Sequence, residues 1–269
     1  DVGLDRSYDV FIADEDALMA TDKCILRAAG RVPDRPVSTA EFHRYLGDDI
    51  AETAPDPHKS FVAIAAKYDV PIYTSSPGDS SIGMNLIVPQ MFRRPIQLDP
   101  IRDVIETAAI VRGAKTNGVL QLGGGSPKNF YLQTQPTLHQ ILLDKSKGGH
   151  DYFIQITTDS PHCGGLSGAT PQEARSWGKI KDANLNNVVV YSCSSIAFPL
   201  IAQYALVKNK KRKLKRLQPK IPALVETMQR VASKKKDLHH SLVHYFDAAP
   251  KQPKPRRKSV KKKTASSRK

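Results

Sequence analysis

Three short apolar segments, each followed at once by glycine or small polar residues, constrain the fold of this chain most strongly. Residues 118–122 (GVLQL) precede three glycines, residues 153–156 (FIQI) precede two threonines, and residues 187–191 (NVVVY) precede Ser-Cys-Ser-Ser. Segments with helical spacing separate them. Strands that alternate with helices pair in parallel through right-handed crossovers. The sequence therefore predicts an α/β fold, with a parallel sheet flanked by helices.

Capping residues and the spacing of apolar residues predict the helices. Residues 14–29 have helical spacing and stop before Gly30, a natural C-cap. Ser38 begins a capping box (STAE), and Asp99 with Pro100 is typical of an N-cap and a first helical residue. The other predicted helices cover residues 60–68, 170–177 and 196–207, and the helix after Pro100 has apolar residues at 101, 104, 105 and 108 on one face.

The net charge of +15 is carried by the carboxy-terminal part of the chain. Residues 208–269 hold 22 of the 41 Lys and Arg and 3 of the 26 Asp and Glu, so their net charge is +19 and that of residues 1–207 is −4. We expect an α/β domain at 1–207, a basic, partly helical extension at 208–249 with an amphipathic helix over 222–246, and a disordered Lys/Arg-rich tail at 250–269. Such a tail either binds nucleic acid without sequence preference or only solubilises the chain.

Cysteine usage and apolar content narrow the cellular setting. Cys24, Cys163 and Cys193 are an odd number without a CxxC pair, which argues against a disulfide framework and for a reducing, cytoplasmic setting. A zinc site made of His162, Cys163 and Cys193 fits no standard ligand spacing, so we expect no metal. No apolar run approaches the ~18 residues of a membrane helix, and we expect neither a signal peptide nor a membrane partner.

Ligands of open α/β sheets bind beyond the carboxyl ends of the strands. If residues 70–74 (VPIYT) form a further short strand, four loops lie there: those that hold Asp79, residues 123–125, residues 157–158 and residues 193–195. Glycines let backbone N–H groups approach a phosphate or ribose closely. The three glycines are not a GxGxxG motif, so a tight strand-to-helix turn explains them equally well.

The helix predicted from Thr170 ends in Trp-Gly-Lys. Glu173 and Trp177 are four residues apart and share a helix face. Taken singly, Glu173 is explained as a cap, Trp177 as a core residue and Lys179 as a solvated surface side chain. A lysine that is removed from water beside an aromatic ring is instead a candidate nucleophile, because burial favours the neutral amine.

Several segments resemble the motifs of deoxyhypusine synthases. They are residues 79–83 (DSSIG), 122–130 (LGGGSPKNF), 167–180 (SGATPQEARSWGKI) and 198–200 (FPL). They follow one another in the family's order within residues 1–206, and the block that contains Trp-Gly-Lys is specific. The chain is most similar to bacterial members, which are deoxyhypusine synthase-like or homospermidine synthase-like.

The resemblance implies a Rossmann-like NAD-binding fold, a homotetramer built from dimers, and active sites between subunits. It also implies an NAD-dependent aminobutyltransferase. Spermidine is oxidised beside its secondary amine, and the active lysine, here Lys179, attacks the imine and releases 1,3-diaminopropane. The butylamine held on Lys179 then passes to an acceptor. The acceptor is a lysine on a translation factor in eukaryotes and archaea, or putrescine in bacterial relatives that make homospermidine.

The resemblance further implies roles for individual residues. Lys179 matches the imine-forming lysine. The positions that line the polyamine pocket are Ser167, Glu173, Trp177 and Asn129, and the positions that contact NAD are Asp79, Gly123, Gly124, Gly125, Thr158 and Ser194. A cationic polyamine favours a carboxylate and an aromatic face, which Glu173 and Trp177 supply.

Some residues depart from the family pattern. Where the family has aspartates in the pocket or the cofactor site, this sequence has Met84, Leu166, Cys163 and Cys193, and Asn129 replaces a histidine. A buried ammonium without a partner costs several kcal/mol. The lost carboxylates therefore weaken the case for spermidine in its usual pose.

Three functions stay open from the sequence. The first is NAD-dependent aminobutyl transfer from spermidine to a protein lysine or to putrescine. The second is a catalytically inactive paralogue that partners an active subunit. It is motivated by the lost acids and by the family's further amino-terminal segment, which precedes the equivalent of Asp1 and supplies the first strands and several NAD contacts. The third is a protein tethered to nucleic acid through residues 208–269.

Overall fold

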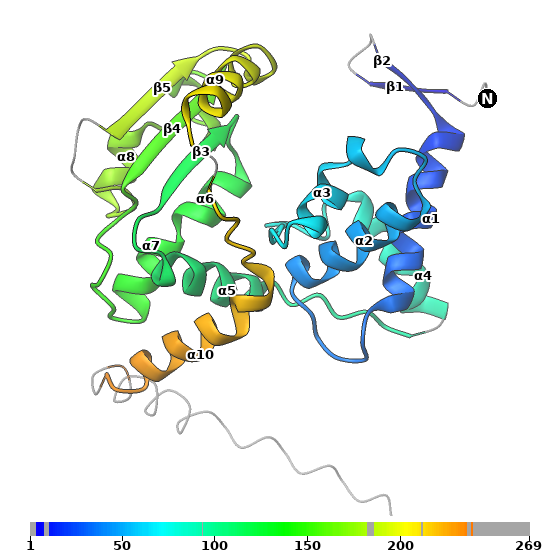
Figure 1. The fold of residues 1–269 in the computed structure, drawn as a ribbon, viewed down its shortest axis with the longest axis horizontal. Helices are drawn as coiled ribbons and strands as arrows, with labels where there is room; N and C mark the ends of the chain where they lie inside the picture. The colour runs from blue at the N-terminus through cyan, green and yellow to red at the C-terminus, as the bar shows by residue number, and fades with distance from the viewer. Residues whose placement is uncertain are drawn as a thin grey trace, which may run out of the picture.

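The computed structural model describes residues 4–7, 11–92, 94–181, 186–210, 212–235 and 238, which form two lobes (Figure 1). The helical lobe contains an antiparallel pair of strands and four helices: β1 (Leu4–Ser7), β2 (Phe11–Asp14), α1 (Glu15–Arg31), α2 (Thr39–Thr53), α3 (Phe61–Lys67) and α4 (Ser81–Phe92). The second lobe contains β3 (Gly118–Leu122), β4 (Tyr152–Thr157) and β5 (Asn187–Tyr191), with α5 (Pro100–Gly113), α6 (Ser126–Leu132), α7 (Thr134–Pro136), α8 (Pro171–Ser176) and α9 (Ser194–Lys208). The last helix, α10 (Ile221–Ala232), packs on α5.

The three strands of the second lobe pair in parallel in the order β3-β4-β5, so the predicted α/β fold is confirmed. The middle strand, β4, supplies the fully buried side chains of Phe153 and Ile156. Phe153 packs with Leu132 of α6, Ala174 of α8 and Ile180, which follows α8. The core of this lobe therefore lies directly beneath the loops that follow the strands.

The predicted N-cap, Ser38, begins α2, whereas the Glu41 carboxylate pairs with Arg35 at 2.5 Å and does not complete the predicted capping box. The Ser38 hydroxyl accepts the N–H of Glu41 at 3.1 Å. Phe42 and Leu46, one helical turn apart, then face the same side and are buried. They pack with residues of α1 such as Ile25 and form the core of the helical lobe.

Helix α1 is capped by Asp14, where the predicted segment begins, but it continues past Gly30 to Arg31, so the predicted end is wrong. Ion pairs to α2 explain the extra length. The Arg31 guanidinium lies 2.5 Å from a Glu52 carboxylate oxygen and 3.5 Å from Asp49, which is fully buried. Arg27, one turn earlier, also donates to Asp49 at 2.9 Å.

Residues 70–74 are not a strand, so that prediction is wrong. No strand of the described chain pairs with them. The N–H of Thr74 donates instead to the Thr39 hydroxyl at 3.0 Å, and the Tyr73 hydroxyl donates to Glu106 at 3.0 Å. These side-chain contacts attach the segment to α2 and α5.

Helix α5 buries the acidic side chains of Asp103 and Glu106 in addition to apolar residues such as Ala108. Its start is as predicted, with the Asp99 carboxylate accepting two backbone N–H groups. Ile101 is nevertheless 68% exposed, whereas Asp103 is fully buried. Asp103 accepts both the backbone N–H (2.8 Å) and the hydroxyl (2.7 Å) of Thr39, so it caps α2 from the other lobe. Burial raises the pKa of Asp103 to about 6.

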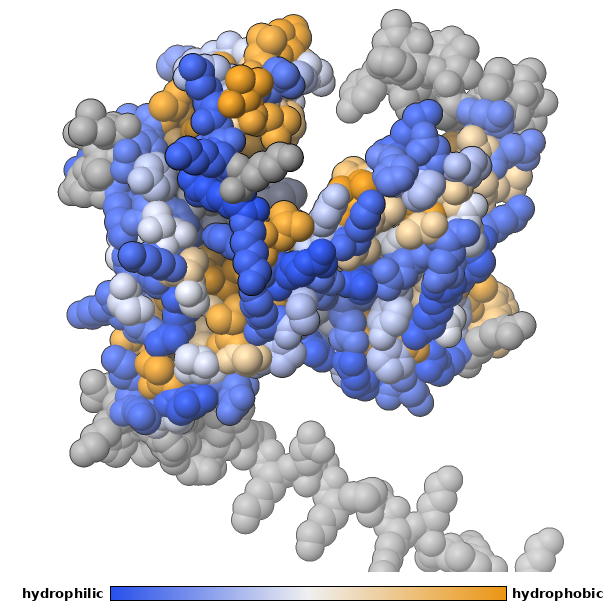
Figure 2. Space-filling view, viewed as in Figure 1, coloured by the Kyte–Doolittle hydropathy of each residue, from blue (hydrophilic) through white to orange (hydrophobic). Residues whose placement is uncertain are grey.

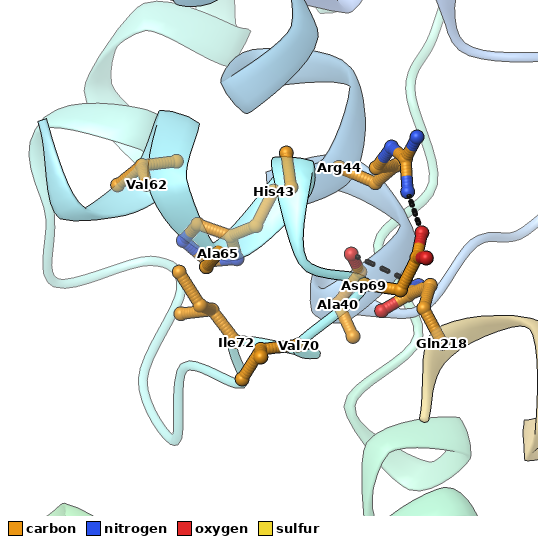
Figure 3. A pocket seen from close by; sticks show the side chains of 10 residues that line it. Ala40, His43, Arg44, Val62, Ala65, Asp69, Val70, Ile72 and Gln218 are labelled. Carbon is orange, nitrogen blue, oxygen red and sulfur yellow. Dashed lines mark hydrogen bonds and ion pairs between the residues drawn. The ribbon is translucent and has the colours of Figure 1, made fainter. Parts of the chain in front are cut away.

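The extension that follows α9 touches both lobes. Arg216 pairs with Asp69 at 2.7 Å, and Asp69 also pairs with Arg44 of α2 at 2.6 Å. The backbone N–H of Gln218 donates to the Asp69 carbonyl at 3.0 Å. Figure 3 shows Arg44, Asp69 and Gln218 together at the edge of a small pocket in the helical lobe.

Helix α10 covers α5 in the second lobe. Met228 is buried with Ala108, Ala109 and Val111, and the Leu224 side chain lies against Gly113. The amphipathic helix predicted over 222–246 is confirmed as far as Ala232. The predicted disordered tail lies outside the described residues, and the predicted domain boundaries remain predictions. No helix in the part of the chain that the structure describes is both long and apolar enough to cross a membrane.

We expect Met228→Ala to lower the free energy of unfolding by about 2–4 kcal/mol, because it leaves a cavity between α10 and α5. The matched control is Gln229→Ala, on the exposed side of the same helix. Chemical denaturation monitored by circular dichroism measures both. Equal effects of the two substitutions would show that α10 does not pack on α5.

We also expect Asp103→Asn to change how stability depends on pH. The pKa of Asp103 is about 6 in the folded chain and 3.8 in its ordinary state, so folding disfavours the ionised form. The wild type should therefore lose up to about 2–3 kcal/mol of stability from this group as pH rises from 4 to 7. Asp103→Asn should remove that loss, whereas Asp34→Asn, at an exposed aspartate, should retain it. An unchanged pH profile in Asp103→Asn would contradict the account.

Candidate functional site

Three loops with predicted site residues meet at one edge of the sheet. Gly123 follows β3, Thr158 follows β4, and Ser194 comes shortly after β5. Parallel strands end at the same edge, so these loops lie side by side, as predicted. The fourth predicted loop, which holds Asp79, comes from the helical lobe. It is attached through Ser75, whose hydroxyl lies 2.8 Å from that of Ser126, the first residue of α6.

The glycine loop after β3 needs its glycines for two different reasons. Gly123 and Gly125 have positive φ angles of 78° and 76°, and a Cβ there would meet nothing within 4 Å. Their backbone is therefore open to an approaching group. Gly124 is close-packed instead, because a Cβ at this position would lie 2.5 Å from the Cα of Ser167.

Two buried glutamines hold these loops, and the sequence analysis missed both. Gln121 of β3 and Gln155 of β4 are opposite each other in the sheet register. Gln121 donates to the Gly123 carbonyl at 2.6 Å, and Gln155 donates to the Ser167 carbonyl at 2.7 Å. The sequence does contain a sign of this pair, because each of the two apolar segments has a glutamine as its next-to-last residue.

Lys179 follows a glycine turn at the end of α8, as the sequence predicted. Gly178 has a φ of 67°, and the N–H of Lys179 donates to the Ala174 carbonyl at 3.0 Å. The Lys179 carbonyl accepts the N–H of His150 at 2.9 Å, and the N–H of Lys181 donates to the His150 carbonyl at 3.0 Å. The backbone of Lys179 is therefore fixed on both sides.

The side chain of Lys179 contacts two predicted site residues. Its ammonium donates to the Asn129 amide oxygen at 3.1 Å and lies 5.7 Å from the centre of the Trp177 ring. Lys179 is half-buried, and Trp177 is 59% exposed, so Trp177 is not a core residue. Glu173 is exposed on the same helix, where its N–H is capped by Thr170 as predicted.

His150 supports the Lys179 segment from within the core. Its ring is fully buried, stacks on Tyr131 at 4.8 Å between centroids, and lies 2.5 Å from the Asn117 amide oxygen. Burial lowers the pKa of His150 to about 4. The histidine is therefore neutral at physiological pH, and its contribution to the site is structural.

Three other predicted site residues come from different parts of the chain. Asp79 and Thr158 are exposed, and Ser194 is half-buried at the first position of α9. Among the described residues, none of these three forms a hydrogen bond or an ion pair with Lys179. Their roles at a cofactor site therefore remain predictions.

Comparison with known proteins identifies the group to which this arrangement belongs. A model described as deoxyhypusine synthase matches residues 1–205. The chain belongs to the deoxyhypusine synthase family. This is a family of enzymes.

Individual relatives agree with this assignment. A deoxyhypusine synthase-like protein of Nostoc punctiforme is 46% identical over 237 residues, which cover 85% of this chain and 60% of the relative. A probable deoxyhypusine synthase 2 of Methanosarcina acetivorans is 38% identical over 217 residues, covering 81% and 61%. A deoxyhypusine synthase-like protein of Coxiella burnetii is 36% identical over 207 residues, covering 76% and 57%. The chain thus spans about 60% of the length of the curated relatives it matches.

Deoxyhypusine synthase family enzymes use NAD, and the glycine loop fits such a cofactor. The open backbone at Gly123 and Gly125 permits the close approach that a dinucleotide needs. Beside this loop lies a cavity of about 370 Å³, lined by β3 together with Gly124, Pro127, Lys128 and Tyr131.

The four positions where the family pattern has aspartates are uncharged here. Met84 on α4 is 73% exposed and Leu166 is 49% exposed. Cys163 and Cys193 are exposed free thiols, and a hydrogen bond from the backbone of Ser195 lowers the pKa of Cys193. No group of three metal-binding side chains lies together within the described ranges.

We expect Gly149→Ala to disturb the Lys179 segment. Gly149 has a φ of 109°, and a Cβ would lie 2.7 Å from backbone atoms of Ile180 and Lys181. The substitution should lower the free energy of unfolding by about 2–5 kcal/mol. Gly148→Ala, with a φ of 67° and nothing within 4 Å, should cost about 1–2 kcal/mol. Urea denaturation measures both, and a Gly149→Ala cost no larger than that of Gly148→Ala would contradict this packing.

Proposed function

We propose that this chain carries out NAD-dependent transfer of an aminobutyl group from spermidine to an amine acceptor through an imine on Lys179. The observation that carries the proposal is the setting of the Lys179 amine. The amine is 3.1 Å from the Asn129 amide oxygen and 5.7 Å from the Trp177 ring centre. The backbone carbonyl of Lys179 accepts a hydrogen bond from the N–H of His150. Family membership supplies the class of reaction.

Each pocket residue has a distinct task in this proposal. The Asn129 oxygen accepts an N–H of Lys179 and thereby orients the amine. The exposed face of Trp177 attracts a cationic amine, and Glu173 adds a negative charge on the same helix. Ser167 contributes a hydroxyl from the turn beside the glycine loop.

The cofactor would be held by Gly123, Gly124, Gly125, Thr158 and Ser194 from the sheet edge and by Asp79 from the helical lobe. NAD, when bound, supplies the oxidation of the carbon beside the secondary amine of spermidine and later returns the same two electrons. The glycine backbone offers N–H groups, and the hydroxyls of Thr158 and Ser194 offer further donors.

The transfer itself proceeds on Lys179. The neutral amine attacks the oxidised carbon, the bond from that carbon to the secondary nitrogen breaks, and 1,3-diaminopropane leaves with that nitrogen. The remaining butylamine is joined to Lys179 as an imine. An acceptor amine then attacks the same carbon and releases Lys179, and reduction of the product imine completes the cycle without net oxidation.

The acceptor is a protein lysine or putrescine, and assembly is proposed as a homotetramer. Helix α9 supports self-association because it exposes apolar side chains over its length (Figure 2). Ile196, Leu200 and Tyr204 are 65%, 70% and 66% exposed. A cytoplasmic location and non-specific binding of nucleic acid by residues 208–269 remain predictions.

The test is release of 1,3-diaminopropane by the purified chain supplied with NAD, spermidine and putrescine. Lys179→Ala should lower the rate at least about 10³-fold, because it removes the nucleophile. The matched control is Lys181→Ala, two residues along, where loss of a surface pair with Asp151 should change the rate less than about threefold. Homospermidine as the second product identifies putrescine as the acceptor.

Unchanged activity in Lys179→Ala would overturn the proposal. Wild-type chain that releases diaminopropane only after a second family member is added would also overturn it. That result would favour an inactive paralogue that partners an active subunit.

A further inference from the structure

We propose that Lys128 is a positioning residue that holds the Ser167 turn, residues 166–169, in register with Lys179, an assignment that rests on the proposed aminobutyl transfer. The sequence resemblance gives a role to its neighbour Asn129 but none to Lys128. Lysine is seldom buried unless its charge has partners, and Lys128 is 8% exposed.

The partners of the Lys128 ammonium are two carbonyls that flank Ser167. Its Nζ donates to Leu166 at 3.0 Å and to Ala169 at 2.6 Å. The segment between them is a single 3₁₀ turn, Leu166–Gly168, which is too short to hold its own carbonyls in place. Charge-assisted hydrogen bonds are stronger than neutral ones, so the ammonium fixes the turn at both ends.

Helix α6 links the Ser167 turn to the Lys179 amine. Lys128 and Asn129 are consecutive on α6; the first binds the Ser167 turn and the second binds the Lys179 amine at 3.1 Å. The helix itself is anchored in the core by Leu132, which is 2% exposed. One rigid turn of α6 therefore sets the spacing between the proposed polyamine contact and the proposed nucleophile.

The other sides of the turn are held to the sheet. Gln155 of β4 donates to the Ser167 carbonyl at 2.7 Å, and Gly124 lies against the Ser167 Cα. These contacts fix the turn to the sheet, whereas Lys128 is the residue that joins it to α6 by hydrogen bonds. Without Lys128, the turn keeps its contacts with the sheet but loses these hydrogen bonds to α6.

The test compares Lys128→Met with Lys128→Arg and with the control Lys59→Met, at a lysine whose side chain is 85% exposed. Lys128→Met should raise the KM for spermidine roughly tenfold while kcat changes less than about threefold, because loss of ground-state binding acts on KM. Lys128→Arg retains charged donors and should restore KM to within about threefold of wild type. Lys59→Met should match wild type.

Hydrogen exchange of the Gly168 and Ala169 amides provides a readout that needs no activity. Both amides should exchange at least about tenfold faster in Lys128→Met than in Lys59→Met, since the turn opens more often. If the wild-type chain releases no diaminopropane, the proposed function fails, and this comparison alone decides the role of Lys128. If Lys128→Met does not fold, Lys128→Gln, which is shorter and cannot reach both carbonyls, is judged by the same criteria. Equal exchange, or a KM equal to that of Lys59→Met, would overturn the proposal.

Discussion

The hydrogen bonds that hold the backbone of Lys179 are the constraint on which the site depends. The segment that carries Lys179 has no strand of its own. It is held because the N–H of His150 donates to the Lys179 carbonyl and the His150 carbonyl accepts the N–H of Lys181. The His150 ring is buried and stacks on Tyr131, which anchors this backbone in the core. A covalent nucleophile requires a position that is held in this way.

Buried polar contacts, together with the contact of the Tyr73 ring with Phe130 of α6 at 6.5 Å between centroids, connect the helical lobe to this site. Asp103 of α5 caps α2 through Thr39, and the same Thr39 hydroxyl accepts the N–H of Thr74. The loop that holds Asp79 follows this segment and is attached to the first residue of α6 through Ser75. The position of a proposed cofactor residue is therefore set by contacts between residues more than 30 positions apart in sequence.

The sequence predicted what local patterns encode. The three strands, the helix caps at Ser38 and Thr170, and the proximity of Lys179 to Trp177 all agree with the structure. Residues 70–74 were predicted wrongly because their β-like composition has no partner strand among the described residues. Their hydrogen bonds go to side chains of distant helices, which no local pattern reveals.

Other parts of the site could not be predicted because they depend on tertiary contacts. Gln121 and Gln155 act as a pair only once β3 and β4 are in register. In the sequence, Lys128 looks like a surface lysine, because its hydrogen-bond partners are carbonyls of the distant Ser167 turn. Ile101 shows the converse, since its apolar side chain is exposed whereas Asp103 of the same helix is buried.

The measurement that tests the central claim most directly is the chemical trapping of the intermediate. The chain is incubated with NAD and spermidine, reduced with borohydride, digested and analysed by peptide mass spectrometry. The account predicts an aminobutyl adduct on Lys179, absent when NAD is omitted. An adduct on Lys128 or on another lysine, or one that persists in Lys179→Ala, would contradict it.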